Sequence, residues 1–240
     1  MRLWAALVLV GALACRPENP RMGAFPPLML WAWERSQDLR GLPAGVGVAF
    51  LAAEVRLEGP GVRVQGRRNP LRVDPGSPLM AVVRIETRAP DLDDAQRRLL
   101  RYRLLELARL PGVQGLQIDF DARASERAFY RSLLGELRRD LPSGMPLSMT
   151  ALASWCLEDP WIRDLPVDER VPMLFRMGSE GERVRRRLAE GGDFIPEARS
   201  ALGLSTDEAW PRLPGGRRVY VFHGGAWDTH AISKLKERLP

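Results

Sequence analysis

Short, nearly continuous apolar runs alternate with amphipathic segments along most of the chain. Eight runs are typical of strands buried on both faces, and they lie at residues 28–33, 46–57, 79–85, 113–120, 147–152, 171–177, 201–204 and 218–222. Apolar residues at three- and four-residue spacing predict two long helices, at 91–110 and 125–141. Shorter helices are predicted at 161–165, 182–189 and 230–239.

The two long helices carry recognisable end signals. Asp91 follows Pro90 and is expected to cap the first helix, which Pro111 and Gly112 end. Its expected buried face consists of Leu92, Ala95, Leu99, Leu100, Leu104, Leu107 and Ala108. The second helix is expected to bury Phe129, Leu133, Leu134, Leu137 and Leu141.

Eight strands that alternate with helices predict an α/β fold, a parallel (β/α)8 barrel of the TIM type. Residues 62–73 alternate in polarity and are expected to form a hairpin insertion after the second strand. A doubly wound open sheet is the alternative. No G-x-G-x-x-G motif follows the first strand, which excludes the dinucleotide-binding form of that alternative. In a barrel, functional side chains are expected at the C-terminal ends of the strands.

The first residues have the features of a targeting segment. A positive start is followed by an apolar run too short to span a bilayer, and small residues then precede Cys15. This order resembles a bacterial lipoprotein signal, which implies lipidation of Cys15 and a membrane-anchored lipoprotein of the bacterial cell envelope, facing the periplasm or exterior. Ordinary secretory cleavage and a buried N-terminal helix are the alternatives. The expected division is a signal segment at 1–15, a Pro-rich leader at 16–27 and one barrel domain at 28–240.

Charge and composition exclude several classes of function. The chain has 36 basic and 30 acidic residues, and no basic tract with interleaved aromatic residues indicates nucleic-acid binding. The only lysines, Lys234 and Lys236, lie in the polar last helix, which argues against Schiff-base chemistry. Two histidines argue against a multi-histidine metal centre. We therefore expect no nucleic-acid partner, no metal and no cofactor.

Carboxylates and tryptophans recur at the predicted strand ends. Indole rings stack on the apolar faces of sugars, and paired carboxylates supply the acid and its partner in glycosidic cleavage. The expected ligand is therefore an oligosaccharide or polysaccharide. The candidate catalytic residues are Asp121, Asp119 and Glu34. The candidate substrate-binding residues are Trp33, Arg84, Trp155, Arg176, His223 and Trp227. Alternatively, the tryptophans pack in the core or rim.

Asp119 and Asp121 are expected to project on the same side of one strand end. A like-charged neighbour raises the pKa of a carboxyl, which keeps a proton donor loaded near neutral pH. Asp121 is therefore the candidate acid, with Asp119 or Glu34 as its partner. The alternative is that the pair holds Arg84, Arg123 or Arg176 in salt bridges.

Residues 114–121, Gln-Gly-Leu-Gln-Ile-Asp-Phe-Asp, resemble the strand-four motif of chitinase-like family 18 glycoside hydrolases. The resemblance implies that Asp119 orients the acetamido group of a substrate and that Asp121 is the acid. Gln114 and Gln117 stand where that motif has aspartates, and Asp121 stands in place of a glutamate.

A wider resemblance covers most of the chain after the leader. Residues 31–35, 117–122, 147–156 and 171–178 look like a bacterial family of unknown function, number 3142. This resemblance implies the barrel fold and an envelope location and points to no particular reaction.

The hypotheses for function belong to different classes. The first is an envelope glycoside hydrolase whose strand-end carboxylates act as acid and base. The alternative is a non-catalytic glycan-binding or envelope-assembly lipoprotein with the same barrel. A third class, phosphoester or phosphosugar chemistry, would use Gly224 and Gly225 after the last strand, although a tight turn also requires glycine there.

Overall fold

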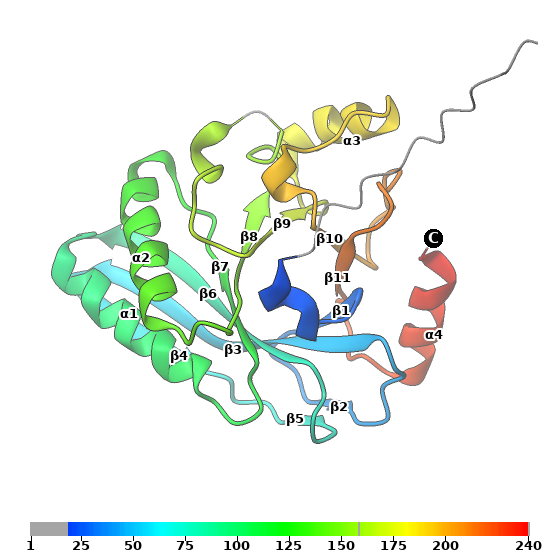
Figure 1. Ribbon diagram of the computed structural model, residues 1–240, viewed down its shortest axis with the longest axis horizontal. Helices are drawn as coiled ribbons and strands as arrows, with labels where there is room; N and C mark the ends of the chain where they lie inside the picture. The colour runs from blue at the N-terminus through cyan, green and yellow to red at the C-terminus, as the bar shows by residue number, and fades with distance from the viewer. Residues whose placement is uncertain (1–18, 158, 240) are drawn as a thin grey trace, which may run out of the picture.

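A computed structural model describes residues 19–157 and 159–239. Eight parallel strands form a closed ring, because β1 pairs with both β3 and β11. In chain order they are β1 (Leu28–Ala32), β3 (Val46–Gly59), β6 (Leu79–Pro90), β7 (Gly115–Asp119), β8 (Leu147–Leu152), β9 (Glu169–Met173), β10 (Ala201–Ser205) and β11 (Arg218–Phe222). The predicted parallel barrel is confirmed (Figure 1).

Helices cover the outside of the barrel unevenly. They are α1 (Asp94–Ala108), α2 (Arg127–Asp140), α3 (Gly181–Ala189) and α4 (Thr229–Arg238). The shorter 3-10 helices are η1 (Pro20–Ala24), η2 (Ala124–Glu126), η3 (Pro160–Ile162), η4 (Gly178–Glu180) and η5 (Pro196–Ala198). The helix expected at 161–165 is reduced to η3. Figure 1 shows α1 and α2 on one side of the barrel and α4 on the opposite side.

Two small strand pairings take the place of helices beside β1 and β3. The far half of the long strand β3 pairs antiparallel with β4 (Gly61–Gly66), whereas its first half pairs with β1. The next strand, β5 (Leu71–Val73), instead pairs in parallel with β2 (Gln37–Leu39). The insertion predicted after the second barrel strand is present, but its residues divide between two sheets.

The first long helix begins later than the sequence predicted. Its N-cap is Asp93, whose side chain accepts a hydrogen bond of 2.7 Å from the backbone N–H of Gln96. Asp91 is not the cap, because its backbone N–H still bonds to the carbonyl of Gly59 at the end of β3. Gln96 turns inward and Leu99 is exposed, so the predicted buried face was partly wrong.

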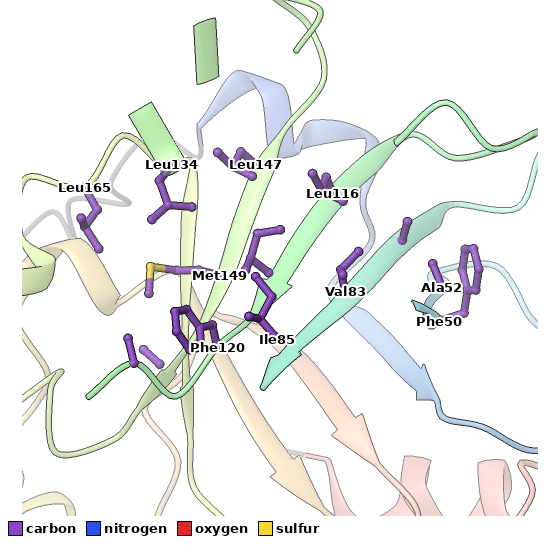
Figure 2. Packing of buried hydrophobic residues seen from close by; sticks show 14 of the residues in the cluster. Phe50, Ala52, Val83, Ile85, Leu116, Phe120, Leu134, Leu147, Met149 and Leu165 are labelled. Atoms are coloured by element: carbon purple, nitrogen blue, oxygen red, sulfur yellow. The ribbon is translucent and has the colours of Figure 1, made fainter. Parts of the chain in front are cut away.

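The main hydrophobic core lies between the outer face of the barrel and its covering helices. Outward-facing residues of neighbouring strands, including Val83, Leu116 and Met149, pack toward Leu134 of α2 (Figure 2). The apolar face predicted for this helix is buried as expected. Cys156 belongs to the same core, and burial raises the pKa of its thiol.

A second set of side chains fills the inside of the barrel. Met29, Trp31, Met80, Val82, Val171 and Tyr220 belong to this inner cluster. Gly203 leaves room for Trp31, because a Cβ at this position would lie only 2.8 Å from Cη2 of the indole. The interior is therefore packed below the C-terminal ends of the strands.

The N-terminal mouth of the barrel is closed by residues of the Pro-rich leader. Figure 1 shows η1 inside the ring of strands. Arg218, the first residue of β11, donates hydrogen bonds of 3.1, 2.8 and 3.0 Å to the carbonyls of Met22, Phe25 and Pro26. Residues 20–26 therefore form the floor of the barrel, and the Arg218 guanidinium holds this floor against the N-terminal ends of the strands.

A network of hydrogen-bonded polar side chains extends from this floor into the barrel interior. Glu169 accepts hydrogen bonds from Arg218 at 2.5 Å, Tyr220 at 2.7 Å and Ser148 at 3.2 Å. Gln117 donates to Ser148 at 3.0 Å and accepts from the indole of Trp31 at 2.9 Å. Burial raises the pKa of Glu169, while Arg218, Tyr220 and Ser148 act in the opposite direction.

Residues 1–18 lie outside the described residues, and with them the signal segment and Cys15. Of the helices in the described residues, none has the length and apolar character needed to cross a membrane.

Replacing Glu169 by Ala should destabilise the fold strongly, since the Arg218 charge would stay buried without this carboxylate. Loss of one member of a buried ion pair costs about 3–5 kcal/mol. Urea unfolding measures the change. The control is Glu58→Ala, which removes an exposed ion pair with Arg88 and should cost less than about 1 kcal/mol. Equal losses in the two variants would contradict the structural role of Glu169.

Candidate functional site

A cavity of about 330 Å³ opens at the C-terminal ends of the barrel strands. Side chains from β1, β6, β7, β8, β9 and β11 line it, together with residues that follow β9. Five of the predicted site residues line it, namely Trp33, Arg84, Asp119, Asp121 and Arg176. This volume is at the lower end of the usual range for ligand pockets.

Glu34 lies apart from this lining, although it follows the end of β1. Its Oε1 accepts hydrogen bonds from the backbone N–H of Asn69 at 2.9 Å, the Asn69 side chain at 2.7 Å and the backbone N–H of Arg68 at 3.2 Å. Burial acts to raise its pKa, but these hydrogen bonds and the charge of Arg67 hold that pKa below its ordinary value. Glu34 therefore secures the loop before β5.

The other three predicted binding residues, Trp155, His223 and Trp227, do not line the cavity. Trp155 is buried and meets Trp161 edge to face, with ring centroids 4.9 Å apart. Trp227 is also buried, and its indole N–H donates to the carbonyl of Trp31 at 3.0 Å. His223 lies against Trp227, and its Nδ1 is 2.6 Å from the hydroxyl of Thr206.

Asp119 is buried at the end of β7. Its Oδ1 accepts a hydrogen bond of 2.7 Å from the Thr150 hydroxyl, and its Oδ2 lies 3.8 Å from Nη1 of Arg84. Burial raises the pKa of Asp119, whereas Thr150 and Arg84 favour the ionised form. Arg84 also donates to Glu86 at 3.1 Å, so one guanidinium joins two carboxylates.

Asp121 follows two residues later and remains accessible to solvent. Its pKa is raised to about 6, first because the surrounding protein displaces water and second because Asp119 carries a like charge. Arg84 opposes the shift. Asp121 therefore holds a proton at mildly acidic pH, as an acid catalyst requires.

Aromatic rings form one wall of the cavity. Phe175 and Phe222 stack with centroids 5.9 Å apart, and Trp33 meets Phe222 edge to face at 6.1 Å. The guanidinium of Arg176 lies over Phe222, 5.1 Å from the ring centroid. The wall is thus apolar, with a cation at its surface.

The sequence analysis did not select several lining residues. Trp31 and Phe222 could have been found, because strand alternation places Trp31 on the face of Trp33 and Phe222 ends the last strand. Glu180 comes from η4, and no local pattern marked it. The described residues contain no group of three or more His, Cys, Asp or Glu that could hold a metal ion.

Comparison with known families identifies one match. Residues 75–171 match the family described as Domain of unknown function (DUF3142). This stretch contains β6, β7 and β8, and therefore Arg84, Asp119, Asp121 and Thr150. The match supports the predicted resemblance to that family over fewer than half of the 240 residues. A search of curated proteins gives no match.

Replacing Asp119 by Asn should lower the pKa of Asp121 from about 6, because the like charge is removed and Arg84 is released from Asp119. The surrounding protein should still keep this pKa above its ordinary value. Carbon-13 NMR titration of the carboxyl groups measures it. Asp91→Asn, a change at an exposed carboxylate outside the cavity, should leave the Asp121 titration unchanged. An unaltered pKa in Asp119→Asn would contradict the coupling.

Proposed function

We propose that this protein hydrolyses a glycan bound in the barrel cavity, with Asp121 as the proton donor. The observation that carries the proposal is an accessible carboxyl with a pKa of about 6 beside a second, buried carboxylate. The aromatic wall that includes Trp33 supplies the apolar surface against which sugar rings pack.

In the first step, the Asp121 carboxyl protonates the glycosidic oxygen, and the bond from that oxygen to the anomeric carbon breaks. Positive charge then develops at the anomeric carbon and ring oxygen of the sugar. The Asp119 carboxylate, oriented by Thr150, stabilises this charge. If the sugar carries an acetamido group, the chitinase-like motif assigns Asp119 to orient that group.

In the second step, water adds to the anomeric carbon and gives up a proton to the Asp121 carboxylate. Asp121 is then again protonated, so the cycle closes without any other proton carrier. Glu34 has no role in these steps, because its carboxylate holds the Asn69 loop outside the cavity lining.

A glycan-binding protein without catalysis is the second candidate. The specific observation in its favour is that Arg84 lies 3.8 Å from Asp119 and 3.1 Å from Glu86, so the buried carboxylate already has a cationic partner. Binding requires the aromatic wall and hydrogen-bonding groups but no proton transfer.

Replacing Asp121 by Asn should reduce turnover by about 10²- to 10⁴-fold, since the amide cannot protonate the leaving group. Binding should change little. The measurement is cleavage of β-linked amino-sugar and neutral oligosaccharides, followed by chromatography. Wild-type turnover should fall as pH rises through about 6, because Asp121 loses its proton there.

Asp91→Asn is the matched control and should retain wild-type turnover. If the wild-type protein binds one of these oligosaccharides but cleaves none, and Asp121→Asn binds it equally well, hydrolysis is excluded and the binding function replaces it.

We further propose that the protein is tethered to the bacterial cell envelope through a lipid on Cys15. The support is the order of positive start, apolar run and small residues before this cysteine.

Cys15→Ser should abolish lipidation, so that the protein appears in the soluble fraction or as an unprocessed precursor. Mass spectrometry of the N-terminal peptide, with immunoblots of membrane and soluble fractions, measures this. Cys156→Ser is the control and should leave the distribution unchanged, because that thiol is buried in the core. A mature wild-type chain with an unmodified Met1 would refute the anchor.

A further inference from the structure

Arg176 differs from the other arginine of the cavity in its charge environment. The guanidinium of Arg84 lies beside Asp119 and Glu86. No carboxylate of the described residues lies within ion-pair distance of the Arg176 guanidinium, which lines the same cavity. Its positive charge therefore faces the cavity without a protein counter-ion in the described part of the chain.

The backbone of Arg176 is held in an unfavourable conformation. Its φ angle is 51°, in the left-handed region that side chains with a Cβ rarely adopt. Glu208 fixes this turn by accepting a hydrogen bond of 2.9 Å from the Arg176 backbone N–H. Strained backbone at a cavity is often retained because it positions a side chain for function.

The strained turn and the aromatic wall together fix the guanidinium. It lies 5.1 Å from the centroid of Phe222, and Phe175 stacks on Phe222. A guanidinium that lies over an aromatic ring still has N–H groups at its edge, and these can bind two oxygens of one anion.

Two carboxylates of the cavity lining, Asp119 and Glu180, have other cationic partners. Arg84 accompanies Asp119, and Glu180 lies 2.9 Å from Arg183. Neither carboxylate is paired with Arg176, whose guanidinium has no ion-pair partner among the described residues. A neutral glycan would not supply one, whereas an acidic glycan would.

We propose that Arg176 binds an anionic group of the glycan, the carboxylate of a uronic acid or a sulfate ester, and so selects acidic glycans. The identification of the ligand as a glycan rests on the proposed function, but the selection for charge does not require cleavage. The guanidinium provides the same paired N–H donors to either anion.

Binding to matched charged and neutral probes tests this selection. The probes are oligogalacturonate and its methyl ester, and κ-carrageenan oligosaccharides and their desulfated form. Calorimetry uses full-length Asp121→Asn protein, so that turnover does not consume the probe. At least one acidic probe should bind about tenfold or more tightly than its neutral counterpart, as expected for hydrogen bonds to a charged group.

Arg176→Gln in the same background should remove this preference, and Arg176→Lys should retain part of it. Arg88→Gln is the control for net charge, because Arg88 is highly exposed and lies outside the cavity lining, and it should keep the full preference. A preference for the uronate pair identifies a carboxylate as the bound anion, and a preference for the carrageenan pair identifies a sulfate.

The proposal is overturned if each acidic probe binds no more tightly than its neutral counterpart, if none of the probes binds, or if Arg176→Gln keeps the preference within about twofold. Wild-type turnover is measured separately on the same probes. Charge-selective binding without cleavage would exclude hydrolysis and leave the role of Arg176 intact. Cleavage of neutral probes without charge-selective binding would support hydrolysis and exclude the proposed role of Arg176.

Discussion

Glu169 and Arg218 form an ion pair inside the barrel, where both side chains are almost completely withdrawn from solvent. Two buried charges are stable only when further hydrogen bonds compensate for the lost hydration. Tyr220 and Ser148 supply them to the carboxylate, and three carbonyls of residues 22–26 supply them to the guanidinium. The ion pair therefore depends on the barrel floor, and the floor depends on the ion pair. Trp31, at the base of the cavity, is oriented through Gln117 by the same network.

In the cavity above this packed interior, the pKa of each aspartate depends on how deeply its carboxylate is buried and on which groups support its charge. Asp119 is deeper, and Thr150 and Arg84 support its negative charge. Asp121 is shallower and lacks comparable support, so displacement of water and the charge of Asp119 raise its pKa. Two aspartates separated by one residue thus acquire different environments, which is a common basis for distinct acid and base roles.

The sequence predicted the features that depend on local pattern. Continuous apolar runs identified the eight barrel strands, and the period of α2 identified its buried face, because both reflect burial against the same core. Alternation along β7 likewise predicted that Asp119 and Asp121 share the cavity. The sequence did not predict the features that depend on contacts between residues far apart in the chain. Glu34 binds a loop 35 residues away in sequence, and Gln96 turns inward to reach carbonyls at the β3–β4 turn. No spacing in the sequence encodes those partners.

Closure of the ring also constrains when the chain can fold. The first strand pairs with the last, and Arg218 must reach the carbonyl of Pro26, 192 residues earlier. Contacts between such distant residues make folding slow, because a large loop must be ordered before they form. During synthesis, β1 and the floor lack their final partner until β11 has emerged from the ribosome. The barrel is therefore completed only after nearly the whole chain has been made, so the growing chain presents an open set of strands until then.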